Sequence, residues 1–209
     1  MSASTDVGQV PPEHDEVDKS KRRFLIGATS AVGAVGTAAL LIPFVSSMAP
    51  SERAKAAGAP VEADIGKLEF GQQMSVEWRG KPVWVVRRTE EMLKALKDSE
   101  DGLKDPRSEV LSQQPSYAKN VYRSIKPEYL IVVGICTHLG CSPTFRPEIA
   151  PADLGSEWKG GWYCPCHGSR FDLAGRVTNN SPAGTNLVIP AHSYLSESQI
   201  LIGVDQESA

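Results

Sequence analysis

Two short stretches rich in cysteine and histidine constrain this chain more than any other feature. The first is residues 136–141 (CTHLGC) and the second is residues 164–169 (CPCHGS). Together they hold all four cysteines of the 209-residue chain and two of its four histidines. Thiolate and imidazole groups are ligands for transition metals and for iron–sulfur clusters. The pattern predicts that two loops meet around one metal ion or one cluster.

Length and charge narrow the class of protein. A chain of 209 residues is long enough for one domain with extensions. The net charge of −3 gives no basic surface for nucleic acid, so we expect no nucleic-acid partner. The content of 22% charged and 41% hydrophobic residues is ordinary for a globular protein, but it is uneven along the chain.

Residues 1–23 form a polar tail on the cytoplasmic side in our interpretation. The tail contains a Pro-Pro pair and five acidic residues before Lys19, and it has no apolar periodicity, so we expect disorder. The acidic residues also argue against a mitochondrial presequence, which is rich in arginine and poor in acids. His14 is expected to be solvated and to bind nothing.

Residues 24–45 are expected to form a single transmembrane helix. These 22 residues carry no charge, and a helix of that length spans roughly 33 Å, enough for a hydrocarbon core of about 30 Å. A cleaved signal peptide and a buried core helix are the alternatives. The basic run up to Arg23 predicts that the N-terminus stays in the cytoplasm and that the C-terminal bulk lies outside it.

Two features flank this span. Residues 20–25 (SKRRFL) resemble the twin-arginine export signal, with lysine in place of the first arginine, and that pathway exports folded proteins with their cofactors. Residues 46–60 are mostly small and lack an apolar stripe, which favours a flexible tether. Alanines could form a transient helix there, but Gly58 and Pro60 would end it.

Residues 61–209 form the predicted head domain, which is mainly β. Alternation over 74–78 and the return at 82–86 predict a hairpin, and a short helix is expected over 89–98 with Thr89 as its N-cap. The apolar run 129–135 predicts a buried strand that leads directly to Cys136. The last strands are expected at 187–189 and 199–204, with a further hairpin over 170–177.

Some parts of the head give weaker signals. Residues 99–127 are polar and rich in turn residues, and no element is assigned to them. Residues 142–163 separate the two stretches and read as mostly loop because of their prolines and glycines. His192 is expected in a polar turn and not as a ligand.

Three interpretations of the cysteines and histidines compete. A structural zinc site uses four ligands, so two of the six candidates would be left over, both of them cysteines. Two plain disulfides suit an exported protein but leave the histidines unexplained. The third interpretation uses all six residues as a [2Fe–2S] cluster with mixed ligands and one disulfide.

In that third interpretation the metal ligands form two pairs. Cys136 and His138 come from the first stretch, and Cys164 and His167 come from the second. The two thiolates bind one iron and the two imidazoles bind the other, which is the Rieske arrangement. Cys141 and Cys166 are then free to join as a disulfide across the loops, outside the reducing cytosol.

Both motifs resemble those of the Rieske iron–sulfur subunit of the bacterial cytochrome bc1 complex. The likeness extends over nearly the whole chain: basic flank, single span, tether, β head, and Ser181-Pro182-Ala183 after the second motif. It implies an antiparallel β-sandwich head with one short helix and a small cluster-binding subdomain at about residues 134–184.

The resemblance also implies a function. The chain would be the electron-transfer subunit of a ubiquinol:cytochrome c oxidoreductase, active only within the complex and coupled to proton translocation. Its partners would be ubiquinol, cytochrome b, cytochrome c1 and membrane lipid, in a complex that is dimeric in this family. The location would be the bacterial inner membrane, with the head in the periplasm and the export signal retained as the anchor.

Residue roles follow from the same likeness. His167 would hydrogen-bond the quinol and accept its proton, while Leu139 and Pro182 would shield the cluster and line the docking surface. Ser169 matches a serine whose hydroxyl hydrogen-bonds a cluster sulfur. Loop packing alone is the alternative explanation for Leu139 and Pro182.

The sequence departs from the family pattern at two positions. Phe171 replaces a tyrosine that donates to a cysteine sulfur in many members, and Gly184 replaces the second proline of the loop after the second motif. Other functions remain open at this point. They are a Rieske subunit of another complex, such as a plastoquinol-using one or arsenite oxidase, and a membrane-tethered structural metal module without a redox role.

Overall fold

The computed structural model describes residues 18–97 and 100–204, and the chain divides into two units, Met1–Ser51 and Glu52–Ala209. The first 17 residues of the predicted polar tail lie outside the described residues. The first unit contains α1 (Lys19–Ser47), an exposed helix long and apolar enough to cross a membrane. The Asp18 side chain caps it by accepting from the Ser20 and Lys21 amides.

Hydroxyl groups within α1 are satisfied by the helix itself. Thr29 donates to the Leu25 carbonyl at 2.6 Å, and Thr37 donates to the Gly33 carbonyl at 2.8 Å. Polar groups in hydrocarbon need such internal partners because lipid offers none. The predicted span at 24–45 lies inside this helix.

The second unit begins with α2 (Glu52–Ala57), a six-residue helix inside the predicted tether. Lys55 donates to Glu52 across one turn at 2.7 Å. The helix stops where the sequence predicts a stop, since Gly58 donates back to the carbonyls of Ala54 and Lys55 and Pro60 follows.

The head is mainly β, as predicted, and its sheets are antiparallel. The described residues of the head form three three-stranded sheets. After α2, they also form one α-helix, α3 (Glu90–Lys97). The first sheet has the strand order β1 (Val61–Asp64), β9 (Gln199–Ile202), β8 (His192–Tyr194). The second has the order β2 (Gln73–Trp78), β3 (Lys81–Arg87), β4 (Tyr129–Val133). The third has the order β5 (Thr144–Arg146), β6 (Gly161–Tyr163), β7 (Arg170–Phe171).

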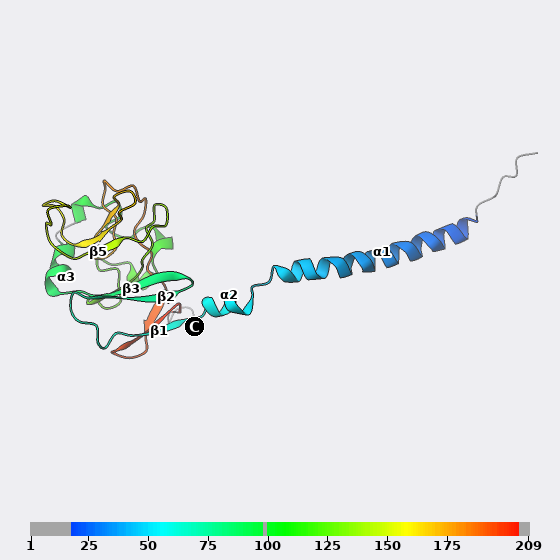
Figure 1. The fold of residues 1–209 in the computed structure, drawn as a ribbon, viewed down its shortest axis with the longest axis horizontal. Helices are drawn as coiled ribbons and strands as arrows, with labels where there is room; N and C mark the ends of the chain where they lie inside the picture. The colour runs from blue at the N-terminus through cyan, green and yellow to red at the C-terminus, as the bar shows by residue number, and fades with distance from the viewer. Residues whose placement is uncertain (1–17, 98–99, 205–209) are drawn as a thin grey trace, which may run out of the picture. The chain divides into compact units, whose positions relative to one another are not determined.

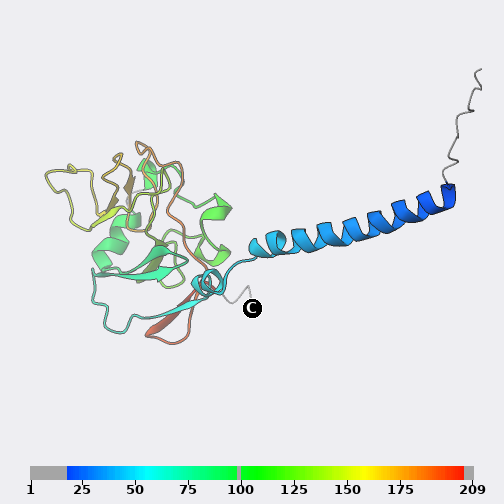
Figure 2. The same cartoon turned by 45° about the vertical axis from the view of Figure 1, so that its right-hand side comes forward.

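The sheet β2-β3-β4 lies between the other two in the head (Figures 1 and 2). Val83 and Val85 of β3 pack toward the sheet β1-β9-β8, while Trp84 and Val86 pack toward the cysteine loops. Alternate side chains of a strand point to opposite faces, so both faces of β3 are buried. Every residue of β4 is buried as well, which explains its continuous apolar run.

Several predicted elements are confirmed. The hairpin β2-β3 closes through Arg79 and Gly80, both at positive φ (53° and 69°), as a two-residue turn that matches strand twist. In α3, Thr89 accepts from the Met92 amide and acts as the predicted N-cap. The predicted strand at 129–135 is β4.

Two predictions near the C-terminus are wrong. Residues 187–189 form no strand, and β8 forms instead. His192 lies in β8 with 1% exposure and not in a polar turn, since its ring contacts the Pro190 carbonyl and its amide donates to the Tyr117 hydroxyl. In the predicted 170–177 hairpin, only β7 and one bridge between Phe171 and Val177 form.

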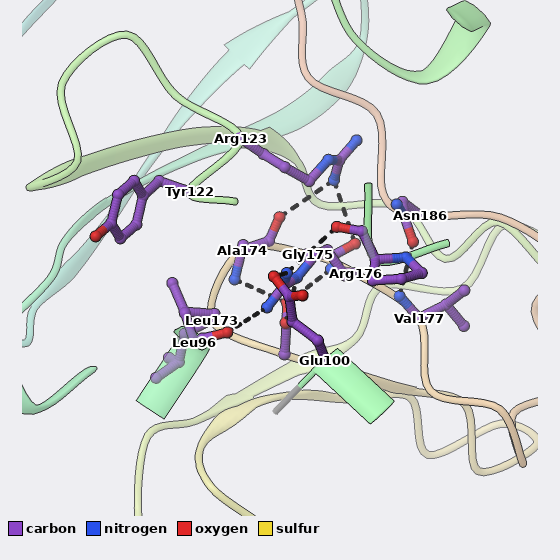
Figure 3. Close-up of polar contacts among 12 residues, drawn as sticks. Leu96, Glu100, Tyr122, Arg123, Leu173, Ala174, Gly175, Arg176, Val177 and Asn186 are labelled. Atoms are coloured by element: carbon purple, nitrogen blue, oxygen red, sulfur yellow. Dashed lines mark hydrogen bonds and ion pairs between the residues drawn. The ribbon is translucent and has the colours of Figure 1, made fainter. Parts of the chain in front are cut away.

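Segment 99–127, which carries no apolar pattern, is held by buried arginines. Its described residues from 100 onward contain three short 3₁₀ helices (Glu100–Gly102, Leu111–Gln113 and Ser116–Ala118). Arg123 donates to the Ala174 carbonyl at 3.1 Å, and Arg176 donates to the Leu96 carbonyl at 2.8 Å (Figure 3). The first bond joins the segment to the loop that follows β7, and the second joins α3 to the same loop.

Arg88 completes this arginine group. It donates to the carbonyls of Tyr122 and Leu173, and like Arg123 and Arg176 it is fully buried. Burial lowers the pKa of Arg88 to about 9 and that of Arg123 to about 10, so both stay charged at neutral pH. Buried charges need hydrogen-bond partners, and here backbone carbonyls supply most of them.

Candidate metal centre

The first cysteine loop follows β4 through a tightly packed glycine. A Cβ on Gly134 would collide with the Trp84 ring, so only glycine lets the chain pass beside that indole. The chain then reaches Cys136, which is buried. The core sheet thereby fixes where the first ligand candidate lies.

The second loop follows β6, and a pair of stacked indoles packs β6 on the central sheet. Trp162 lies 5.8 Å from Trp84 between ring centroids, with the planes 6° apart. Its Nε1 donates to the Gln73 side chain at 2.9 Å. Trp162 is fully buried, so β6 and the loop that follows it are anchored to the central sheet.

The two loops share one backbone hydrogen-bond pattern. The Cys136 amide donates to the Cys141 carbonyl at 2.7 Å, and the Cys164 amide donates to the Ser169 carbonyl at 2.8 Å. The Cys136 carbonyl accepts from Gly140, and the Cys164 carbonyl accepts from Gly168.

Both glycines have positive φ, 85° and 78°. This conformation explains why glycine occupies the fifth position of each motif. Two sequences with different ligand spacing therefore form loops of the same shape.

A disulfide joins the loops through Cys141 and Cys166, the pairing that the family resemblance implies. The Sγ atoms of Cys141, Cys164 and Cys166 lie within 4.8 Å of one another. These three sulfurs cannot form a metal site together, because two of them are bonded to each other. Cys136 and Cys164 remain as buried thiols outside the disulfide.

Each loop also contributes one histidine, and the two rings are in contact. The rings of His138 and His167 meet edge to face with centroids 4.8 Å apart. The Nδ1 atom of His138 is buried and has no hydrogen-bond partner in the described part of the chain. A buried ring nitrogen without a partner suits a metal bond, so the donor set of two thiols and two imidazoles fits a Rieske cluster.

The surroundings of Cys164 both oppose and favour its thiolate form. Burial raises the pKa of its thiol, the amide of Cys166 lowers it by hydrogen bonding, and the neighbouring Cys136 thiol raises it further. The His167 amide also lowers it. A metal cation at this place would deprotonate both thiols and remove the mutual repulsion.

Ser169 ends the second loop, Phe171 lies two residues further on, and both are buried. Ser169 is buried, and its Oγ accepts from the Ala183 amide at 3.1 Å, which leaves the hydroxyl hydrogen to donate elsewhere. Phe171 is fully buried in the same apolar cluster as Cys136 and Cys164. Its side chain offers no hydrogen-bond donor to a sulfur.

The tip of the centre is exposed and partly apolar. Leu139 is 71% exposed, and His167 and Pro182 are also exposed, whereas His138 is half-buried. Single exposed apolar residues are ordinary. Here Leu139 and His167 lie on the two loops that the disulfide holds together.

Sequence reasoning missed one fixing contact. The Thr137 hydroxyl donates to the Thr185 carbonyl at 2.6 Å and ties the first loop to the segment after Pro182. The threonine lies between two ligand candidates, but its partner is 48 residues away, so no local pattern could have revealed the bond.

Comparison with known proteins supports this assignment. Residues 106–193 match the family described as "Rieske [2Fe-2S] domain", and residues 11–51 match "Ubiquitinol-cytochrome C reductase Fe-S subunit TAT signal". The ubiquinol-cytochrome c reductase iron-sulfur subunit of Allochromatium vinosum is 64% identical over 202 residues, 97% of each chain. That of Blastochloris viridis is 38% identical over 90% of this chain and 96% of its own. A chain titled "Hyperthermophilic respiratory Complex III" aligns over 83% of this chain and 96% of its own, at 26% identity and a TM-score of 0.45.

Proposed function

This chain belongs to the family of ubiquinol–cytochrome c reductase iron–sulfur subunits, and we propose that it serves as the electron-transfer subunit between ubiquinol at cytochrome b and cytochrome c1. One observation supports the proposal: two loops of one shape are joined by a disulfide, and each carries one buried thiol and one imidazole. The cofactor is one Rieske [2Fe–2S] cluster.

We assign the ligands by donor type. Cys136 and Cys164 would hold one iron, and His138 and His167 would hold the other, within a cluster-binding subdomain at residues 134–184. The bound group supplies one-electron chemistry at a potential of roughly −150 to +300 mV, above that of all-cysteine clusters, because imidazoles replace two thiolates. The unpartnered Nδ1 of His138 supports its place in this set.

His167 would hold the quinol and take its proton. Its side chain is exposed, so the ring nitrogen that does not bind iron can meet a quinol hydroxyl directly. A general base must lie within hydrogen-bond reach of the proton that it accepts, and among the ligand candidates His167 is the exposed one. His138 is half-buried and suits a ligand role alone.

Leu139 and Pro182 would form the apolar part of the docking surface. Both are exposed on the free protein and flank the reactive loop ends. Burying them against cytochrome b would exclude water around His167 and strengthen its hydrogen bond to the quinol. Ser169, from beneath, would donate its remaining hydrogen to a ligand or cluster sulfur.

The chain is a membrane-anchored subunit, with α1 as its anchor. We propose that it crosses the inner membrane once, with the N-terminus in the cytoplasm and the head in the periplasm, in a complex that contains two copies. The basic run 19–23 precedes the apolar helix, as expected for a cytoplasmic end. The match to a twin-arginine signal model supports export of the folded head with its cofactor.

Spectroscopy of the purified complex tests this proposal. Reduction with ascorbate is expected to produce the paramagnetic signal of a Rieske cluster, and the preparation should contain b- and c-type haem. A silent spectrum from a protein with stoichiometric zinc would overturn the redox assignment. A normal signal without b-type haem would instead place the chain in a different quinol-oxidising complex.

A further inference from the structure

We infer that Lys104 is a positioning residue for the metal centre, because it fixes the Pro182 loop, residues 181–183, against Ser169. Lys104 Nζ donates to the Ser181 carbonyl at 2.7 Å and to the Ala183 carbonyl at 2.8 Å. These two carbonyls flank Pro182. One ammonium group therefore brackets the exposed proline from both sides.

Lys104 is itself held in place by its backbone. Its amide donates to the Val177 carbonyl at 3.0 Å, and Leu103 beside it forms a bridge with Thr178. The Asp105 carbonyl accepts from the Asn186 side chain at 2.9 Å. Segment 102–105 thus lies along 177–179 like an added edge strand, and the lysine stem starts from a fixed point.

The other side of the Pro182 loop contacts the second cysteine loop and its continuation. Ala183 donates its amide to Ser169 Oγ at 3.1 Å, and Ser181 Oγ accepts from the Arg170 amide at 2.8 Å. The loop is therefore held between Lys104 and the chain that carries Ser169. Moving Ala183 would change the acceptor geometry of Ser169 and the direction of its remaining hydrogen.

The sequence gives this lysine a task. Gly184 stands where a second proline would stiffen the loop, and a Cβ at this position meets nothing within 4 Å. Neither ring rigidity nor side-chain packing at residue 184 restrains the loop. Two charge-assisted hydrogen bonds from Lys104 supply that restraint, and such bonds are stronger than neutral ones.

The inference rests on the cluster assignment proposed above. Reduction adds negative charge to the centre, so a nearby ammonium and a well-directed Ser169 hydroxyl both favour the reduced state. Removing Lys104 should therefore lower the midpoint potential and loosen the Ala183 amide. Loss of fold stability alone would speed hydrogen exchange, but it would not lower the midpoint potential, so the potential is the deciding readout.

The test compares Lys104→Met and Lys104→Arg in the complete complex. Lys104→Met should shift the reduction equilibrium about fivefold toward the oxidised form, about 40 mV at 59 mV per tenfold. Hydrogen exchange of the peptide containing Ala183 should become faster. Lys104→Arg keeps the charge and the donors and should keep both values near those of the wild type.

Lys67→Met is the matched control, because it removes the same charge from an exposed lysine that follows β1. In this variant, the midpoint potential and the hydrogen exchange of the peptide containing Ala183 should not change. If Lys104→Met matches the wild type in both readouts, the inference is overturned. Should Lys104→Met fail to accumulate, Lys104→Gln decides in its place, and an unchanged potential and exchange in that variant overturn the inference.

Failure of the cluster assignment looks different from failure of the Lys104 inference. A wild-type complex without the Rieske signal overturns the proposed function and this inference with it. A wild-type signal with unaltered Lys104 variants overturns only the role of Lys104.

Discussion

The two cysteine loops have the same backbone shape but differ in what they expose. Each begins with a buried cysteine, turns at a glycine with positive φ, and closes through the same pair of backbone hydrogen bonds. Yet His138 is half-buried in the first loop, and His167 is exposed in the second. The same loop shape therefore leaves one imidazole half-buried and the other exposed.

The last position of each loop differs as well. Cys141 ends the first loop and forms the disulfide, whereas Ser169 ends the second and binds the Ala183 amide. In the function proposed above, each loop would supply one thiolate and one imidazole ligand. The first loop adds the disulfide cysteine and the exposed Leu139. The second would add the proton acceptor His167 and the Ser169 hydroxyl as a donor to a sulfur.

Removing a thiol from either loop should have the largest effect. It tests whether the two loops are equally needed to hold the cluster. Cys136→Ser and Cys164→Ser should each abolish the EPR signal of the reduced complex, because a cluster missing one thiolate ligand is not retained. Ser142→Ala, next to the first loop and exposed, is the control. A full signal from either cysteine variant would show that the ligand set is different.

Removing the disulfide should have the next largest effect, on stability. The double variant Cys141→Ala, Cys166→Ala removes a cross-link between cysteines that are 25 residues apart in sequence. Loop-closure entropy then gives a loss of about 3 kcal/mol in the free energy of unfolding. The temperature at which the EPR signal disappears should fall clearly below that of the wild type. Equal thermal loss in both proteins would mean that the cluster alone holds the loops together.

Hydrogen-bond donors on the second loop should shift the potential in opposite directions. Ser169→Ala removes a donor to sulfur, and Phe171→Tyr adds one at a buried position among the thiols. One hydrogen bond contributes about 1 kcal/mol, roughly 40 mV for one electron. Redox titration should show a fall for the first variant and a rise for the second; shifts of one sign would contradict the argument.

The smallest effect is expected from the exposed tip of the first loop. Leu139→Ala should raise the KM for quinol about threefold, since part of one apolar side chain is no longer buried on docking. Ile149→Ala is a matched control because Ile149 is 68% exposed and Leu139 is 71% exposed. Steady-state kinetics with equal effects in both variants would remove Leu139 from the docking surface.

The sequence predicted the parts of the fold whose pattern is local. Alternation marked β2, and the turn after it marked β3 as the returning strand. A continuous apolar run marked β4, and an N-cap marked α3. The disulfide between Cys141 and Cys166 is present as the family resemblance implies, while the four metal ligands stay a prediction.

The parts that escaped prediction depend on distant polar partners. Segment 99–127 is held by guanidinium groups bonded to backbone carbonyls, which any residue can offer, so it has no periodic signature. His192 looked like a turn residue because its burial comes from Tyr117, 75 residues earlier. The Lys104 contacts were hidden for the same reason, with 77 residues between donor and acceptor.

The buried arginines have a consequence for the speed of folding. Arg88 and Arg176 bond carbonyls 85 and 80 residues away, and Arg123 bonds one 51 residues away. Contacts between such distant parts of a chain form only after large loops close, which slows folding. These charged hydrogen bonds are therefore expected to form late in folding. If the head is exported folded, as proposed above, the chain must stay in the cytoplasm until they have formed.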